Sequence, residues 1–354
     1  MQKVLLKSTS YQFTIYNGTH PRGTRIVSTT NPTPSANVKK YLYQGDALTQ
    51  EDINALASEG SVTYIMEAGM ELVWETFDET TGEMAVIPDG LSVTFFGAAG
   101  GEKPTIKSNK TIEIDGNHNY VSFENVAFIN TGSAYLINEG NTSSLETLSF
   151  TDCTFNDYTR SIIRLKDNAS ISIGNLIIDN CVITNQGSDN YACFYWNNAA
   201  YSIANFIMSN TTVNTALHNV MDFRSSNTTN IEIENCTFYN VIGASRYFLD
   251  CQNIAPTIKL TNLIFAKANT AVLAEGVWTS TSRGVRANST PTISGVYFTA
   301  DFVFGSNAFK PTYEYNNTSE NLFTDPENGN FTIKDSSFDG KNSAGDPRWY
   351  MSAE

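Results

Sequence analysis

The segment "IEIENCTFYN", residues 231–240, places an Asn between two short runs in which apolar and polar residues alternate. The arrangement recurs six times, as "VSFENVAFIN" (121), "LSFTDCTFND" (148), "LIIDNCVITN" (176), "FIMSNTTVNT" (206), "IKLTNLIFAK" (258) and "PTISGVYFTA" (291). The central positions lie 25 to 33 residues apart and are Asn125, Asp152, Asn180, Asn210, Asn235, Asn262 and Gly295. A repeat of this length indicates stacked structural units.

The alternation predicts strands with one buried face, and the central Asn predicts a tight bend between them. Asn, Asp and Gly suit such a bend because they tolerate the left-handed backbone conformation. Each unit then adds a third short strand, in "SIIRLKD" (161), "ACFYWNN" (192), "NVMDFRS" (219) and "RYFLDCQ" (246). Three strands per coil, without long helical patterns, predict an all-β fold, the right-handed parallel β-helix.

The ends of the chain read differently from its repeats. Residues 1–30 contain "YQFTIYNGTHPRGTRIVSTT", a hairpin-like pair of alternating strands that predicts the remnant of a β-sandwich, and residues 31–40 form a linker. Residues 41–350 form the β-helix, with a short capping helix that begins after Thr49 and runs to about Ser58. A C-terminal segment closes the solenoid, and we expect its Trp349 to pack on the last coil.

Composition and charge exclude several classes of function. The chain has 36 acidic and 22 basic residues, so its net charge of −14 argues against nucleic acid or anionic lipid as a broad partner. No apolar run approaches the roughly 20 residues of a membrane-spanning helix. The five cysteines form no metal-binding or redox motif, and their odd number predicts free, buried thiols.

Three further segments stand beside the Asn-centred coils: "VTYIMEAG" (62), "LSVTFFGAAGGEKPTIK" (91) and "TDPENGNFTIKDSSFDGKNSAGDPRW" (324). With these segments, most of the chain resembles the pectate-lyase-like β-helix proteins of surface glycan-utilisation systems in gut anaerobes. The first 30 residues are similar to the last two strands of a fibronectin type III module. The resemblance implies an exported protein, commonly a lipoprotein at the outer cell surface, that meets polysaccharide.

The third strands supply the candidate site. In each third strand four residues are compared, and these quartets are residues 163–166, 194–197, 221–224 and 249–252. Their alternation turns the first and third residue of each quartet inward and the second and fourth outward. The resulting exposed sheet carries Arg164, Lys166, Tyr195, Asn197, Asp222, Arg224, Asp250 and Gln252. Amides and charged groups bond to sugar hydroxyls, and Tyr195 suits a pyranose face. We therefore expect a polysaccharide-binding protein, acting as a monomer, whose third-strand sheet forms the groove.

An enzyme is the alternative interpretation. A polysaccharide lyase needs a base and a cation beside the uronate, so Arg224, Arg164 or Lys166 would act there, and Asp222 with Asp250 would hold Ca²⁺. A glycoside hydrolase would use Asp222 and Asp250 as its two carboxylates. The binding interpretation requires no cofactor. Cross-strand ion pairs in a structural or adhesive module explain the same charges and remain open as a third possibility.

Overall fold

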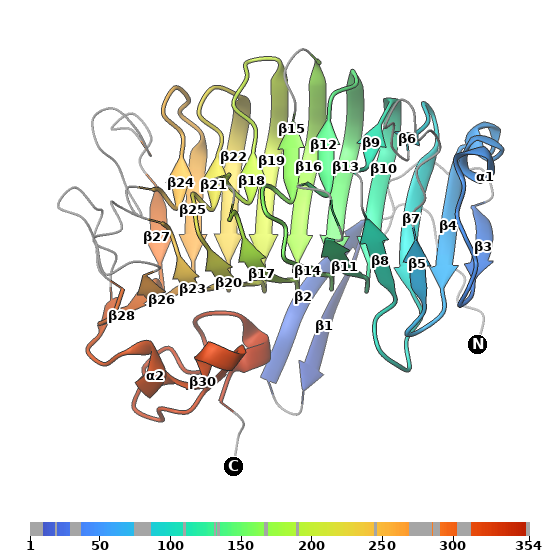
Figure 1. The fold of residues 1–354 in the computed structure, drawn as a ribbon. Helices are drawn as coiled ribbons and strands as arrows, with labels where there is room; N and C mark the ends of the chain where they lie inside the picture. Colours follow the sequence, from blue (N-terminus) through green and yellow to red (C-terminus); the bar gives the residue numbers. More distant parts are fainter. Residues whose placement is uncertain are drawn as a thin grey trace.

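The computed structural model describes residues 37–73, 86–108, 111–130, 132, 135–165, 169–188, 191–243, 246–268, 285, 291–302 and 313–351, and the backbone of residues 10–17 and 20–28. This part of the chain is mostly β and forms a parallel β-solenoid of about eight turns, with a short helix at its N-terminal side (Figure 1). The predicted fold class is confirmed. None of the helices in the described part of the chain has the length and apolar composition needed to span a membrane.

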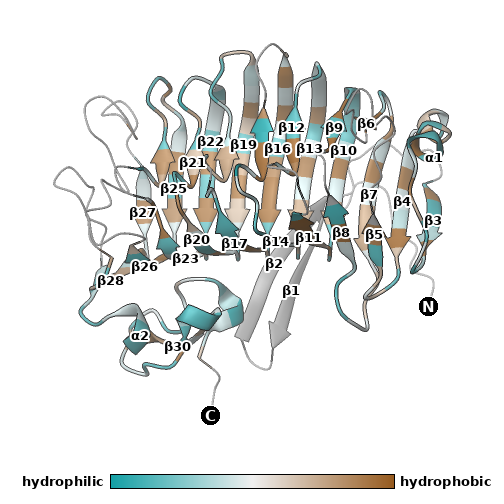
Figure 2. Cartoon of the chain, in the orientation of Figure 1, coloured by the Kyte–Doolittle hydropathy of each residue, from teal (hydrophilic) through white to brown (hydrophobic). Residues whose placement is uncertain are grey.

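The first sheet runs the length of the solenoid and contains ten parallel strands. They are β3 (Val38–Leu42), β4 (Ser61–Met66), β7 (Ser92–Gly97), β10 (Gly116–Glu124), β13 (Ser143–Thr151), β16 (Ile171–Asp179), β19 (Tyr201–Ser209), β22 (Asn227–Glu234), β25 (Thr257–Thr261) and β27 (Thr292–Ser294). Hydrophobic and polar bands alternate along these strands in Figure 2. This alternation follows from the pleat, which turns every second side chain into the core.

The second sheet also contains ten strands and follows the first around each coil. Its members are β5 (Glu71–Val73), β8 (Thr105–Ser108), β11 (Ala127–Asn130), β14 (Thr154–Asn156), β17 (Val182–Gln186), β20 (Thr212–Ala216), β23 (Thr237–Val241), β26 (Ile264–Ala268), β28 (Tyr297–Thr299) and β29 (Tyr313–Tyr315). The third sheet has five very short strands, β12 (Ile137–Glu139), β15 (Ile163–Leu165), β18 (Phe194–Tyr195), β21 (Met221–Asp222) and β24 (Leu249–Asp250). The paired strands β6 (Val86–Ile87) and β9 (Glu113–Ile114) precede them.

The bend between the first two sheets is formed by the repeated Asn. All seven central residues have a left-handed backbone, with φ between 49° and 65°. Their amides also stack along the solenoid: Asn262 Nδ2 donates to Asn235 Oδ1 at 3.1 Å, and Asn235 Nδ2 donates to Asn210 Oδ1 at 3.4 Å. The bend predicted from the sequence is therefore correct in both its residues and its conformation.

The core is built from columns of identical positions in successive coils. Phe95, Phe123 and Phe150 stack with ring centroids 5.2 and 5.1 Å apart. Phe128 and Phe155 form a second stack, 5.2 Å apart, that meets the first edge to face. The five cysteines are buried and free, as predicted.

The N-terminal cap agrees in part with the prediction. Helix α1 (Gln50–Asn54) begins after Thr49, whose hydroxyl caps the amide of Asp52 in a capping box, but it is shorter than predicted and is followed by the 3₁₀ turn η1 (Ala57–Glu59). Strand β3 begins at Val38, so the solenoid extends into the predicted linker. Strands β1 (Ser10–Asn17) and β2 (His20–Ser28) form the expected antiparallel hairpin.

The C-terminal segment lies along the side of the solenoid beneath the second sheet (Figure 1). It comprises α2 (Ser319–Leu322), β30 (Phe323–Asp325), η2 (Pro326–Asn328), β31 (Asn330–Ile333) and η3 (Pro347–Trp349). Trp349 Nε1 donates to Thr212 Oγ1 at 2.8 Å, on β20, so the prediction that it packs on the last coil is wrong. The segment instead covers the outer face of the second sheet, which carries the apolar side chains of Tyr239, Ile264 and Ala266.

Candidate functional site

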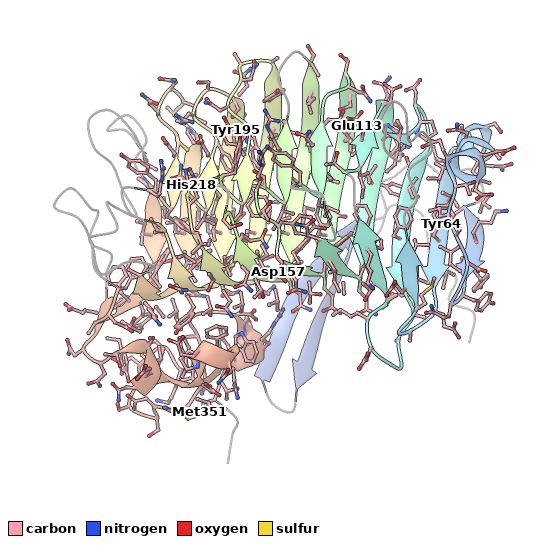
Figure 3. All side chains as sticks on the ribbon, viewed as in Figure 1. Tyr64, Glu113, Asp157, Tyr195, His218 and Met351 are labelled. Carbon is pink, nitrogen blue, oxygen red and sulfur yellow. The ribbon has the colours of Figure 1, made fainter. Side chains whose placement is uncertain are left out.

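The third sheet carries one continuous row of outward-facing positions. Backbone register places Asn138, Arg164, Tyr195, Asp222 and Asp250 side by side on successive coils. A bridge between Ile112 and Ile137 sets Glu113 beside Asn138, which extends the row by one coil. Figure 3 shows Glu113 and Tyr195 at the same level of the solenoid. Neighbouring strands lie about 4.8 Å apart, so this third-sheet row presents a polar side chain at each step along the axis.

The residues that alternate with the row fill the core, as predicted. Each is at most 3% exposed; they are Ile163, Leu165, Phe194, Trp196, Met221, Phe223, Leu249 and Cys251. Trp196 and Phe223 stack with ring centroids 4.0 Å apart. This packing fixes the strand orientation and therefore the outward direction of the row.

The acidic end of the row is buried, which corrects the prediction that Asp222 and Asp250 are exposed. Their side chains are 2% and 0% exposed. The Nε of Arg224 lies 2.7 Å from Asp222 Oδ1 and 3.7 Å from Asp250 Oδ2. Burial opposes the charge of Arg224, but its hydrogen bond to Asp222 and the two carboxylates outweigh burial and raise its pKa. Arg224 therefore supplies one positive charge to the two carboxylates at this end from within the protein.

The fourth positions of the quartets do not lie on the sheet. Strands β18, β21 and β24 contain only two residues each, so Asn197, Arg224 and Gln252 lie beyond the strand ends. Asn197 and Gln252 are half-buried there. Lys166 lies outside the described residues.

The opposite end of the row carries an arginine–tyrosine cluster, formed by Tyr135, Arg160, Arg164, Tyr191 and Tyr195. Tyr191 meets both Tyr135 and Tyr195 edge to face, with ring centroids 5.9 Å apart in each pair. The guanidinium of Arg160 lies 5.0 Å from the Tyr191 ring centroid and donates to the Tyr135 hydroxyl at 3.1 Å. Arg164 lies 5.4 Å from the Tyr135 centroid. Burial raises the pKa of Tyr135, although the hydrogen bond from Arg160 opposes this effect.

The sequence interpretation missed three members of this cluster, although the chain contains a signal for two of them. Four consecutive coils carry Arg160, Tyr191, His218 or Arg246 three positions before the third strand begins. A column of large polar side chains at a constant offset predicts a second row beside the first. Tyr135 stands one position out of that column, because β12 starts two residues after it.

Arg164 has an incomplete set of partners. Its Nη1 donates to Asn138 Oδ1 at 3.3 Å. Its Nε is buried from solvent without a hydrogen-bond partner, and within the described residues no carboxylate lies within 4.0 Å of the guanidinium. A buried, unsatisfied donor on a charged group is costly, so this Nε–H would gain from an acceptor.

The residues present do not fit the Ca²⁺ site that a lyase would use. Calcium takes six to eight oxygen ligands, whereas Asp222 and Asp250 already face the guanidinium of Arg224. Among the described residues, no group of three or more His, Cys, Asp or Glu side chains is arranged to hold a metal ion.

Glu139 is a second acid that the sequence interpretation missed. It occupies an inward position of β12 and is 2% exposed. Backbone N–H groups of Ile114 and Asn141 each donate to it at 2.6 Å. Burial raises its pKa to about 7, although these hydrogen bonds oppose the shift. Glu139 therefore satisfies backbone donors beneath the row and has no access to a substrate.

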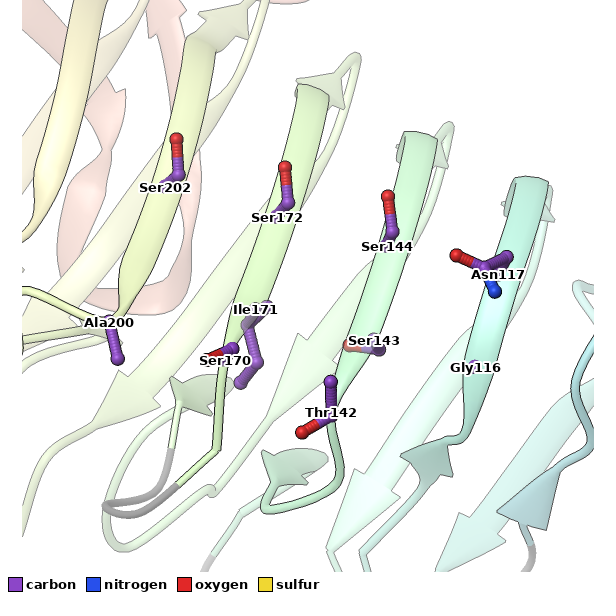
Figure 4. Close-up of a pocket in the computed structure, with 10 residues that line it drawn as sticks. All are labelled: Gly116, Asn117, Thr142, Ser143, Ser144, Ser170, Ile171, Ser172, Ala200 and Ser202. Carbon is purple, nitrogen blue, oxygen red and sulfur yellow. The ribbon is translucent and has the colours of Figure 1, made fainter.

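A shallow groove lies where the chain passes from the third sheet into the first sheet of the next coil. Its volume is about 330 Å³. It is lined by small and polar residues, with Asn117, Ser144, Ser172 and Ser202 in one register column (Figure 4). This column follows the third-sheet row along the same coils.

Comparison with known proteins gives a match for the C-terminal part of the chain only. Comparison with curated proteins and with solved structures gave no match. Residues 231–349 match the model of a family described as a domain of unknown function (DUF5123). The matched segment runs from the middle of β22 through η3, so it contains the last coils and the segment that packs beneath the second sheet. To this extent the chain is similar to a DUF5123 domain.

Proposed function

We propose that the protein binds polysaccharide outside the cell along the third-sheet row, with the arginine–tyrosine cluster as the main contact. The observation that carries the proposal is the half-buried ring pair Tyr191 and Tyr195, held beside Arg164 and Asn138 on adjacent coils. Aromatic rings suit the apolar faces of sugar rings, and the guanidinium and amide groups suit their hydroxyls. The rigid sheet fixes these groups before a ligand arrives, which reduces the entropic cost of binding.

The same surface gives less support to an enzyme. General acid–base chemistry requires a side chain within hydrogen-bond reach of the substrate. Asp222 and Asp250 are buried and face Arg224, so the proposed pair of carboxylates has no open path to a glycosidic bond. We therefore place the ligand at the tyrosine end of the row and give the acidic end a structural role.

Affinity electrophoresis against a panel of plant and host polysaccharides tests the proposal, with product release measured on the same samples. We expect retarded migration without products, and we expect Tyr195→Ala and Tyr191→Ala each to weaken it by roughly ten-fold, as stacking energies of 1–1.5 kcal/mol imply. Tyr41→Ala is the matched control, because Tyr41 is an exposed tyrosine on β3, in the first sheet. Unchanged binding in both cluster variants would overturn the placement, and unsaturated or reducing-end products would favour the enzyme.

A further inference from the structure

We infer that the arginine–tyrosine cluster selects acidic sugar residues and that Arg164 contacts their oxyanion, either a carboxylate or a sulfate. This inference rests on the proposed function and names the class of glycan. Its basis is the contrast between the two ends of the third-sheet row, which differ in how their positive charges are balanced.

At one end the protein supplies the counter-charge itself. Arg224 lies against Asp222 and Asp250, and in the C-terminal segment the Nε of Arg348 lies 3.0 Å from Asp346. Both arginines are about one-fifth exposed, at 22% and 21% of the side chain. A half-buried guanidinium is thus paired with a buried carboxylate at both of these places, as desolvation of a charge requires.

Arg164 is also half-buried, but its neighbours are an amide and a ring. Asn138 accepts from Nη1, and Tyr135 lies against the guanidinium face. The described part of the chain offers it no carboxylate within 4.0 Å. Glu113 stands in the row on the far side of Asn138 and accepts from the side chain of Asn141 at 3.2 Å. Among the described residues the charge of Arg164 therefore has no carboxylate partner, and the inference assigns that place to the ligand.

The unused donors have the geometry of a fork. Because Nη1 is engaged by Asn138, the Nε–Nη2 edge of Arg164 remains, and its Nε has no hydrogen-bond partner in the described part of the chain. Two parallel N–H groups on one guanidinium edge match the two oxygens of a carboxylate or sulfate. Because Nε is shielded from solvent, a ligand reaches this edge after neighbouring side chains change rotamer, as interface side chains commonly do on binding. Arg160, 5.0 Å from the Tyr191 ring, adds a second positive charge beside the same ring.

The test compares matched pairs of polymers that differ only in charge. Polygalacturonate is paired with its fully methyl-esterified form, and dextran sulfate is paired with dextran; affinity is measured by titration calorimetry. We expect tighter binding of at least one acidic polymer than of its neutral partner. We expect Arg164→Gln to lower that affinity roughly 10- to 100-fold, as loss of a charge-assisted bidentate contact implies, with little effect on neutral polymers.

Two further variants complete the design. Arg164→Lys keeps the charge but removes the fork, so it should lose part of the affinity, and it serves if the Gln variant does not fold by circular dichroism. Lys259→Gln removes an exposed positive charge from the first sheet, where Lys259 pairs with Glu232, and should leave the affinity unchanged.

The outcomes separate the two proposals. Equal binding of acidic and neutral polymers, or an equal loss in Lys259→Gln, would overturn the inference while glycan binding stands. Binding of no polymer in any arm would overturn both. Preference for polygalacturonate alone identifies the oxyanion as a carboxylate, and preference for dextran sulfate alone identifies it as a sulfate.

Discussion

Substitution of Asn235 tests whether the repeated Asn contributes backbone conformation, side-chain stacking or both. Its φ is 53°, a conformation that costs an ordinary L-residue about 1–2 kcal/mol and costs Gly almost nothing. Its amide accepts from Asn262 at 3.1 Å and donates to Asn210 at 3.4 Å. Asn235→Gly removes only the stacking, and Asn235→Ala removes the stacking and adds the strain.

The magnitudes follow from these contacts. Two hydrogen bonds of about 0.5–1 kcal/mol each predict a loss of about 1–2 kcal/mol for Asn235→Gly. Gly also loses about 0.5–1 kcal/mol more chain entropy on folding than Ala, which partly offsets the strain that Ala suffers. Asn235→Ala should therefore be less stable than Asn235→Gly by about 0.5–1 kcal/mol.

Asn230 provides the matched control because it stacks without the special conformation. It donates to Asn205 Oδ1 at 2.9 Å and lies within β22, and its φ is not positive. At position 230 the order of stability should reverse, with Asn230→Gly less stable than Asn230→Ala by about 0.5–1 kcal/mol. Urea unfolding, followed by circular dichroism with equal m-values for all four variants, measures both differences. If Ala is as stable as Gly at position 235, the left-handed bend is not what selects Asn there.

Three other changes probe the core, the acidic end and the buried acid. Phe150→Ala should cost about 3–5 kcal/mol in urea unfolding because Phe150 is fully buried within the phenylalanine stacks; a loss below about 1 kcal/mol would show that the stack closes around the gap. Arg224→Met should cost about 3 kcal/mol, and the added substitutions Asp222→Asn and Asp250→Asn should restore part of it; no restoration would mean that Arg224 acts through packing. The folded pKa of Glu139 is raised from 4.5 to about 7, so its stabilisation is complete below pH 4.5 and is lost as the pH rises through 7. Stability should fall by about 3 kcal/mol between pH 4.5 and 8, and Glu139→Gln should flatten this dependence; an unchanged pH profile of the urea midpoint would contradict the assignment.

The fold could be predicted because its determinants are local and repeat in every coil. The left-handed bend requires a particular residue type at one position, so Asn125, Asn180 and Asn235 record it directly in the sequence. The inward columns are equally visible, since a one-residue slip would turn a whole strand's apolar side chains to solvent. The path of the C-terminal segment could not be predicted in this way, because Trp349 finds Thr212 more than a hundred residues away.

For the candidate site, the sequence predicts which side chains point away from the core but not which of them are exposed. Alternation along the third strands tells which side chains leave the core, and register places Arg164, Tyr195, Asp222 and Asp250 in one row. The alternation does not tell what covers these side chains. Asp222 and Asp250 prove to be buried beside the guanidinium of Arg224, which lies two residues after Asp222 and one coil before Asp250. Strand β18 also has only two residues, so its fourth position lies beyond the strand end, which is why Asn197 is not part of the sheet.

The net charge of −14 and a subsite for an acidic sugar are compatible because they act over different distances. At about 0.1 M salt, charges more than about 10 Å apart on the surface are largely screened, so the overall charge mainly sets how readily a polyanion approaches. Contact is decided at the site itself, where Arg224 lies against the nearest acids in the row, and Arg160 and Arg164 lie against tyrosine rings. The local balance around Arg164, rather than the charge of the whole chain, therefore determines which glycan this surface can hold.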